Sequence, residues 1–398
     1  MTNNRVPSTD RETMSKHDFT PAEFADRLSR LRHAIAAAGL DWLLVLHPVS
    51  IRWLIGQDTK SYTAFQCLPV SAEPRPLVMF TRGTERAEFE ADTMAEAFRF
   101  YGGGEPEDPI QAFARFANEL GLRNARVGME VPGGYLQPPH YVALKSLLGT
   151  ALVQDSSGLV TGLRAVKSPA ELAYARQAAT ISALAWEALI GAVAEGKSEL
   201  ELAAIAYHAL LSNGSGIPAS TMNLMTGERS AFALGGPTER RLKRGDTGLV
   251  EIGANRRRYT STLGRQWNLG PASQRLKDLH AVIREATEVC IAEMHAGVPA
   301  VVPHEAAKRV IAKADFDHYR MHTTGYGMAP GFPPSWGESP NVFGGSSDIL
   351  KSGMVVSIEP HVFLAQEGLG ARLIDNVVIT ETGTELLSRT PRDLIIVD

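Results

Sequence analysis

Residues 248–265 have the sequence GLVEIGANRRRYTSTLGR, in which one acid lies inside an apolar run. Residues 249–252 are predicted to form a buried strand that contains Glu251. The Gly-Ala-Asn at 253–255 is predicted to break this strand, and residues 256–259 to begin a second extended run. A carboxylate inside an apolar strand costs free energy unless something pairs with it. Glu251 is therefore either a structural acid, bonded to backbone or to a nearby arginine, or a catalytic or metal-binding group.

The composition is that of a globular protein with more than one core. At 398 residues the chain is too long for a single ordinary core, so two domains are expected. With 44% hydrophobic residues and a net charge of −4, it gives no reason to expect nucleic-acid binding. It has no apolar stretch of about 18 residues, so no association with a membrane is expected. Cys67 and Cys290 form no metal or redox spacing, and a reducing cytoplasm is the simplest compartment.

The succession of helical and extended patterns predicts a leader and two domains. Residues 1–18 are polar and are expected to form a disordered leader. Residues 19–160 alternate as in a small α/β domain. Residues 165–398 begin with a helix start at Ser168, where Glu171 completes a capping box. Two helices, strands, two more helices and strands again follow, which predicts an α+β domain of two similar halves.

Three strands of this second domain carry an acid inside an apolar run. The acids are Glu251, Glu359 and Asp375. One such acid is easily structural, whereas three in one domain favour carboxylates that converge on a cavity. The sequence leaves both interpretations open.

Two further segments make the order of elements similar to that of the pita-bread superfamily. They are GMVVSIEP at 353–360 and LIDNVVITETGTELLS at 373–388. The superfamily includes methionine aminopeptidase, prolidase, aminopeptidase P, creatinase and ectoine hydrolase. The resemblance implies a creatinase-type N-terminal domain followed by a pita-bread catalytic domain. It also implies a homodimer in which the N-terminal domain approaches the partner's active site.

The metallopeptidases of this superfamily hold two metal ions with Asp, Asp, His, Glu and Glu side chains. The resemblance carries these five positions to Glu251, Thr262, Tyr326, Glu359 and Asp375. Threonine does not replace a bridging carboxylate, and tyrosine rarely replaces an imidazole as a ligand of such an ion. Because two of the five ligands are lost, no metal and no other cofactor are expected.

Ectoine hydrolase, a metal-independent member, has the most similar pattern. Its E-I-x-x-x-x-R-R-Y stretch resembles residues 251–259, and its TGYSIG…PPDWGE loop resembles residues 324–338. Two features depart from it. The acid of the SIEP motif is absent there but present here as Glu359, and its histidine before a Gly-Asp turn has no counterpart in residues 233–237. The resemblance implies hydrolysis of a C–N bond in an amidine, guanidine or cyclic amide of a small amino-acid-like compound.

The resemblance and the residue types together give a set of candidate site residues. Glu251 is the predicted nucleophile, with a structural pair to Arg258 or Arg265 as its alternative. Proton transfer or substrate binding is expected of the other groups, with Trp336 stacking on a cationic face. The candidate catalytic residues are Glu251, Tyr326, His322, Glu359 and Asp375. The candidate substrate-binding residues are Arg265, His361, Trp336, Tyr62 and Phe65.

Two other functions remain open from the sequence. A metallopeptidase of the Xaa-Pro type would bind two metal ions and lose activity on chelation. A non-catalytic binding protein of the same fold would keep the acids only as part of its shape and would hydrolyse nothing.

Overall fold

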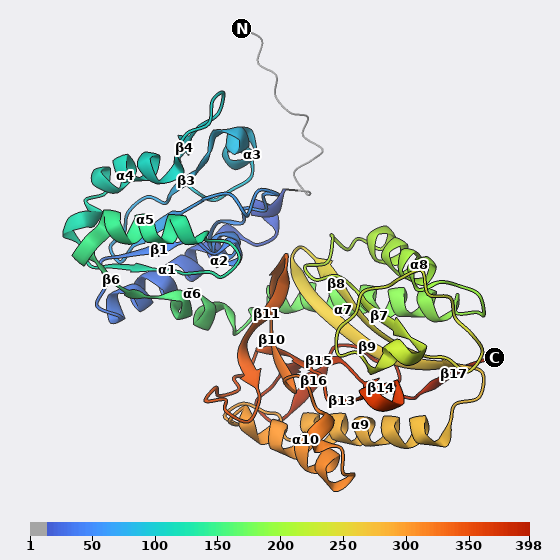
Figure 1. The fold of residues 1–398 in the computed structure, drawn as a ribbon. Coiled ribbons are helices and arrows are strands. Elements are labelled where there is room, and N and C mark those ends of the chain that lie inside the picture. The colour runs from blue at the N-terminus through green and yellow to red at the C-terminus, as the bar shows by residue number, and fades with distance from the viewer. Residues whose placement is uncertain (1–13) are drawn as a thin grey trace. The chain divides into compact units, whose positions relative to one another are not determined.

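The computed structural model describes residues 14–398, which divide into two compact units (Figure 1). The first unit ends at Arg164, and the second spans Ala165–Asp398. Residues 1–13 of the predicted leader lie outside the described residues. The leader does not extend to residue 18, because Ser15–His17 form a 3-10 turn that is bonded to the first unit. The Ser15 hydroxyl donates to Asp92 at 2.8 Å.

The first unit is an α/β domain whose central strand is buried on both faces. Trp42 and Leu44 pack in one core, and Leu43 and Val45 pack in another on the opposite face. The four-stranded sheet has the order β2-β1-β5-β6, with β1 parallel to β5 and β5 parallel to β6. A parallel pair, β3 and β4, stands apart from it. The elements of the unit are α1 (Pro21–Ala37), β1 (Trp42–Val45), α2 (Pro48–Ile55), β2 (Leu68–Ser71), β3 (Val78–Arg82), α3 (Arg86–Ala91), β4 (Ala97–Tyr101), α4 (Pro109–Glu119), β5 (Val127–Met129), α5 (Pro138–Leu148), β6 (Leu152–Asp155) and α6 (Ser157–Arg164).

The second unit is built on a nine-stranded sheet. Its main path has the order β16-β15-β12-β10-β9-β8-β7, while β11 pairs with β10 and β17 with β9. A short pair, β13 and β14, lies outside this sheet. The strands are β7 (Asn223–Thr226), β8 (Thr247–Arg256), β9 (Tyr259–Leu269), β10 (Gly325–Phe332), β11 (Ser335–Val342), β12 (Val355–Ile358), β13 (His361–Leu364), β14 (Leu369–Arg372), β15 (Asp375–Ile379), β16 (Thr384–Leu386) and β17 (Ile395–Val397).

Two helix pairs cover the two halves of this unit. The first pair, α7 (Pro169–Ile190) and α8 (Glu199–Ser212), forms a core with β7, β8 and β9. The second pair, α9 (Gln274–Ala292) and α10 (Val301–Lys313), forms a core with β12, β13 and β15. The predicted capping box of Ser168 and Glu171 begins α7. The α+β class is confirmed.

The hairpin of β8 and β9 differs from its prediction. Strand β8 continues through residues 253–255, each of which is paired with a residue of β9, and the chain turns at Arg257 and Arg258. Both arginines have positive φ, 51° and 71°, as in the tight turns that suit the twist of a hairpin. The predicted break at 253–255 is therefore wrong, and Glu251 lies in the middle of one long hairpin.

Within residues 14–398, no helix is both long enough and apolar enough to cross a membrane.

Candidate functional site

A cavity of about 430 Å³ opens in the second unit and gathers side chains from five strands. Glu251 comes from β8, and Asn223 lies directly opposite it on β7. Side chains from β10, β11, β14 and the loop before β10 also line the cavity. They include Tyr326, Trp336, Arg372 and His322.

Glu251 is buried but keeps one carboxylate oxygen without a partner. Its Oε2 accepts a hydrogen bond from Asn223 Nδ2 at 2.8 Å and lies 3.2 Å from Arg372 Nη1. Among the described residues, nothing hydrogen-bonds to its Oε1. Burial raises the pKa of Glu251 above its usual value, and the positive charge of Arg372 only partly opposes this. The unpartnered oxygen is the one that is available for bond formation or proton transfer.

Arg372 lies between Glu251 and Glu359. Its Nη2 donates to Glu359 Oε2 at 2.5 Å, while its Nη1 faces Glu251. Burial alone would lower the pKa of Arg372, but the charges of the two acids raise it above its usual value. The guanidinium therefore remains charged and neutralises part of the negative charge of both acids.

Glu359 is fully buried and does not line the cavity. Burial tends to raise the pKa of Glu359, but Arg372 and the hydroxyl of Ser357 outweigh it and hold this pKa below its usual value. Ser357 donates to Glu359 Oε1 at 2.8 Å. Glu359 was predicted to be catalytic. The structure shows it instead as a buried anion that holds Arg372 in place.

Tyr326 and Trp336 meet on the wall of the cavity. The Trp336 indole donates to the Tyr326 hydroxyl at 3.2 Å, and Glu359 is among the acids near that hydroxyl. Burial and the nearby acids raise the pKa of Tyr326 well above its usual value, so the phenol stays protonated at neutral pH. Both residues line the cavity, while a catalytic role for Tyr326 and a substrate contact for Trp336 stay predictions.

His322 and His361 are neighbours with different tasks. The Nε2 atom of His361 accepts the backbone N–H groups of Met321 and His322, at 3.0 and 2.8 Å. Its Nδ1 donates to the Glu359 carbonyl at 2.8 Å, and burial lowers the pKa of His361 to about 4. His361 is thus neutral and fully occupied. His361 was predicted to contact the substrate, but in the structure it fixes the loop that carries His322.

His322 lines the cavity from the loop before β10. Its Nδ1 donates to the Thr323 carbonyl at 3.0 Å and lies 3.8 Å from Glu359 Oε2. One third of its side chain is exposed. Because Nδ1 carries the proton of the neutral ring, Nε2 is the atom that can accept a proton from a ligand and return it.

Asp375 and Arg265 are placed away from the cavity, in contrast to their predicted roles. Arg265 Nη2 donates to Asp375 Oδ1 at 2.7 Å, and Arg392 binds the other carboxylate oxygen at 2.5 Å. The remaining Arg265 donors bond to backbone carbonyls, among them that of Pro391. This buried ion pair ties the C-terminal segment to β9. It leaves neither side chain free to contact a substrate.

Tyr62 and Phe65 belong to the first unit, where their surroundings differ. Phe65 is buried in an aromatic core and packs edge-on against Phe80 and Phe113. Tyr62 is partly exposed and packs edge-on against Tyr135. Phe65 is therefore a core residue, whereas a substrate contact for Tyr62 stays a prediction.

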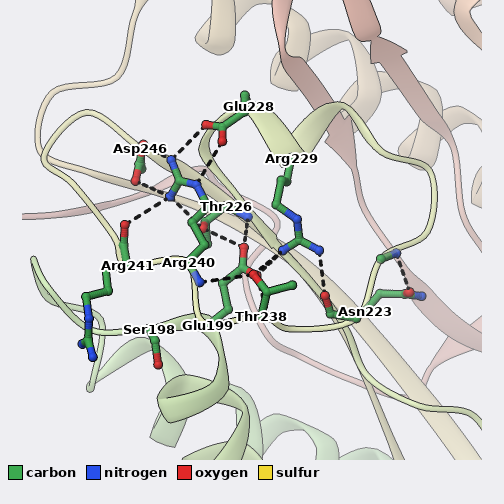
Figure 2. A network of polar contacts seen from close by, with 12 residues as sticks. Ser198, Glu199, Asn223, Thr226, Glu228, Arg229, Thr238, Arg240, Arg241 and Asp246 are labelled. Carbon is green, nitrogen blue, oxygen red and sulfur yellow. Dashed lines mark hydrogen bonds and ion pairs between the residues drawn. The ribbon is translucent and has the colours of Figure 1, made fainter.

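A network centred on Glu199 holds the loop of residues 227–238, which borders the cavity (Figure 2). Glu199 Oε1 accepts the backbone N–H and hydroxyl of Thr226, and Oε2 accepts the same two groups of Thr238 and a guanidinium N–H of Arg229. Within this loop, the Gly235 N–H donates to Asn223 Oδ1 at 3.1 Å. Asn223 thus joins the loop to Glu251.

Two residues of the site were not predicted from the sequence, Arg372 and Asn223. Arg372 lies in an apolar run next to the expected acids, which is a weak signal for a site residue. Asn223 follows a Gly-rich loop and resembles an ordinary turn residue. The strand pairing of Asn223 with Glu251 would have been needed to find it.

The residues at the metal-ligand positions do not fit a divalent ion. Thr262 Oγ1 accepts from Asn376 Nδ2 at 3.0 Å, Tyr326 is protonated, and Asp375 is bound to two arginines. Arg372 already places a positive charge between Glu251 and Glu359. Within residues 14–398, no group of three or more His, Cys, Asp or Glu side chains is arranged to hold a metal.

Comparisons with known proteins agree with this architecture. Residues 173–381 match the metallopeptidase family M24, and residues 27–166 match the creatinase/prolidase N-terminal domain. The chain is 26% identical to the ectoine hydrolase of Halomonas elongata, over 95% of this chain and 98% of that protein. It is 29% identical to the Xaa-Pro dipeptidase of Pyrococcus furiosus, over 72% of this chain and 81% of that protein.

A solved structure is similar over almost the whole chain. It is that of dipeptidase PepE from Mycobacterium ulcerans, with a TM-score of 0.85 and 25% identity, covering 95% of this chain and 99% of that one. The M24 match alone spans more than half of the 398 residues. The chain therefore belongs to the metallopeptidase family M24, the pita-bread superfamily, with a creatinase-type N-terminal domain.

Proposed function

We propose that this protein is a metal-independent hydrolase that cleaves a C–N bond in a small amino-acid-like compound, in the manner of ectoine hydrolase. The bond belongs to an amidine, a guanidine or a cyclic amide. One observation carries the proposal: Arg372 lies between Glu251 and Glu359, and the other metal-ligand positions hold neutral or occupied groups. The similarity to an ectoine hydrolase over nearly the full length supports it.

The proposed reaction starts at the unpartnered oxygen of Glu251. Oε1 attacks the carbon of the C–N group, and the π electrons of that carbon move onto its heteroatom. When this electron pair returns, the C–N bond breaks, and the departing nitrogen takes a proton from Nε2 of the protonated His322 ring, which becomes neutral. The carbon is now held to Glu251 by an ester-like bond. Water adds to this carbon and gives a proton to Nε2, which restores the protonated ring. The bond to Glu251 breaks, which restores the carboxylate.

The remaining side chains of the cavity suit a small, charged, partly planar ligand. The Trp336 indole offers a flat apolar surface, and a cationic amidine stacks favourably on such a face. The charge of Glu251 attracts the same group. Leu234, which is largely exposed, lines the cavity and belongs to residues 233–237, the region in which the resemblance implies a histidine that this chain lacks. The proton transfers are therefore assigned to His322.

A second candidate function is Xaa-Pro dipeptide hydrolysis. The similarity to an Xaa-Pro dipeptidase, at 29% identity, favours it. This function would require metal ions that the site residues do not fit, so it ranks second.

A turnover screen tests the proposal. The substrates are ectoine, hydroxyectoine, creatine, related cyclic amidines and Xaa-Pro dipeptides, each with and without EDTA. Hydrolysis of an amidine or cyclic amide that EDTA leaves unchanged is the expected result. Chelator-sensitive cleavage of Xaa-Pro peptides would establish the second function. Binding of such compounds without any hydrolysis would identify a non-catalytic member of the fold.

We further propose that the protein is a homodimer, as the creatinase-type N-terminal domain implies. Two-fold dimers are the commonest assemblies of this kind. Light scattering at micromolar concentration should give twice the chain mass of 43.0 kDa. A monomer with full activity would contradict the proposal.

A further inference from the structure

One apolar side chain of the cavity wall is largely exposed to solvent. Leu234 lines the cavity, yet its relative exposure is 63%. Its neighbour Ala233 packs instead against the small core of Met225, Leu249 and Phe363. The fold gains little from Leu234, because the hydrophobic effect stabilises only apolar surface that is removed from water. Its position at the cavity wall is therefore better explained by contact with a ligand.

The backbone that follows Leu234 is tied to β7. The Gly235 N–H donates to Asn223 Oδ1 at 3.1 Å, and the Gly235 carbonyl accepts the Leu224 N–H at 2.9 Å. The same Asn223 donates through Nδ2 to Glu251 Oε2 at 2.8 Å. One amide side chain therefore holds both the acid of the site and the loop beside it.

The backbone that precedes Leu234 is held from another direction. Arg372 Nη1 lies 3.2 Å from Glu251 Oε2 and donates to the Ala233 carbonyl at 3.4 Å. Leu234 thus stands between two backbone contacts, and the side chains that make them also contact Glu251. A side chain presented on a fixed backbone can recognise a ligand without the entropy cost of ordering a loop. Leu234 is therefore a fixed part of the cavity wall.

Trp336 presents a second apolar surface from the opposite side of Glu251. It comes from β11, which pairs with β10, whereas the loop of residues 227–238 is bonded to β7, at the other side of β8. The indole lies over Gly253, where a Cβ atom would be 2.7 Å from the ring. Gly253 and Glu251 lie on the same face of β8, because the faces alternate along a strand. A ligand carbon next to Glu251 thus has an apolar surface on each side.

We propose that the substrate carries an apolar substituent, an alkyl or aryl group, on or beside the carbon of its C–N group, and that Leu234 selects for it. The polar C–N group then lies at Glu251, and the substituent lies between Leu234 and Trp336. Its burial removes the apolar surface of the substituent and of both side chains from water, which favours binding. The inference rests on the proposed function and adds to it the part of the substrate that does not react.

Binding of two amidines that differ only in this group provides the test. Acetamidine carries a methyl group and benzamidine a phenyl group on the same cationic head. In calorimetry, wild-type protein should bind benzamidine about tenfold or more tightly than acetamidine, because the pocket buries the larger apolar group. Leu234→Ala should lose most of this preference, while its Kd for acetamidine changes by about twofold at most. Where a probe is hydrolysed, the ratio of kcat/KM values replaces the ratio of Kd values.

Leu234→Met and Leu211→Ala are the matched controls. Methionine keeps an apolar side chain of similar volume, so Leu234→Met should keep the preference. Leu211 is also exposed, at 47%, but it lies on α8 and does not line the cavity. Its replacement should change neither Kd. All three variants should unfold within about 2 °C of wild type, because each replaced side chain is exposed.

Three results would overturn the inference. One is a wild-type protein that binds acetamidine as tightly as benzamidine, or that binds neither probe at about 10 mM. Another is a preference for benzamidine that Leu234→Ala keeps. The third is a Leu234→Ala variant with a lower assembly mass in light scattering, which would make Leu234 a contact between subunits. Failure of the proposed function is seen separately, as an absence of turnover by a wild-type protein whose binding preference still depends on Leu234.

Discussion

Glu251 differs from Glu359 and Asp375 in the contacts of its carboxylate. Arginines or hydroxyls bond to both oxygens of the other two acids, whereas Oε1 of Glu251 has no partner among the described residues. Of three acids with similar sequence surroundings, only Glu251 therefore keeps a carboxylate oxygen without a partner among the described residues.

Replacing Glu251 by glutamine tests its role as nucleophile. The amide keeps the shape and can still accept from Asn223, so we expect the fold to survive. Turnover should fall by about three orders of magnitude or more, because the groups of such a site act as a unit. Mass spectrometry of quenched wild-type enzyme should detect an adduct on Glu251 that the variant lacks. Near-normal turnover by the variant would make Glu251 structural.

Asn223 is expected to set the protonation of Glu251. Its hydrogen bond lowers the pKa of Glu251, although burial keeps that pKa above the usual value. If catalysis needs the ionised carboxylate of Glu251, kcat/KM should rise with pH. The acidic limb of this pH profile should move to higher pH in the Asn223→Ala variant. Asn223→Asp should move it further, because a second carboxylate then stands beside the first. A pH profile of kcat/KM that neither variant displaces would contradict this role.

At this scale, sequence reasoning reaches the residues that lie within motifs. The resemblance singled out Glu251, Tyr326 and Trp336 in this way, and the structure places them at one cavity with His322, while their roles stay predictions. It could not reveal that Arg372 bridges two acids, since one of them is more than a hundred residues away in sequence. Nor could it show that Asp375 pairs with Arg265. An acid inside an apolar run can be a structural ion-pair partner or a site residue, and the local sequence looks the same in both cases.

At the scale of elements, the β8–β9 hairpin shows why a local pattern misled the prediction. Gly253 resembles a strand breaker because glycine favours turns. In the structure it continues the strand and allows Trp336 to pack closely, since a Cβ atom there would lie 2.7 Å from the indole. The reason for the glycine is a contact with a distant residue, which no local window contains. Helix starts such as Ser168 were predictable because a capping box is local.

The loop of residues 227–238 offers a test of how elements support the site. Glu199→Ala removes the buried acceptor that holds both ends of this loop (Figure 2). The buried donors of Thr226 and the half-buried donors of Thr238 then lose their partner, so we expect a loss of about 3–5 kcal/mol in the free energy of unfolding. Urea denaturation measures it.

Glu228→Gln is the control for this prediction. Glu228 belongs to the same loop and pairs with Arg240, but its side chain is 72% exposed. Exposed pairs contribute little, so the change should stay within about 0.5 kcal/mol. Equal losses in the two variants would show that the buried Glu199 network does not hold the loop.

At the scale of the whole molecule, the sequence predicted the two domains, the α+β class and the family. Long, regular patterns of apolar and polar residues determine these features, and such patterns can be read from the sequence. The start of the first domain was placed too late in the sequence. The polar residues near Ser15 gave no sign that the Ser15 backbone N–H and hydroxyl donate hydrogen bonds to Asp92.

The stability of the second unit should depend on pH through His280 of α9. Burial lowers the pKa of His280 to about 4, and the charge of Arg284 contributes in the same direction. Its Nε2 is buried without a partner among the described residues, so a proton there would be a poorly compensated charge. The unfolded chain, with a histidine pKa of about 6.5, takes up the proton first as the pH falls. The contribution is therefore complete above about pH 6.5 and is lost progressively toward pH 4.

Urea unfolding at pH 7.5 and pH 5 checks this prediction. Wild-type protein should lose about 2 kcal/mol more than His280→Gln between these two pH values, because glutamine takes up no proton. Tryptophan fluorescence can follow the transition, since Trp186 and Trp267 are buried in the same unit. Other buried histidines, such as His361, are present in both proteins and cancel in the comparison. An identical loss in the two proteins would mean that His280 carries its proton in the folded state as readily as in the unfolded chain.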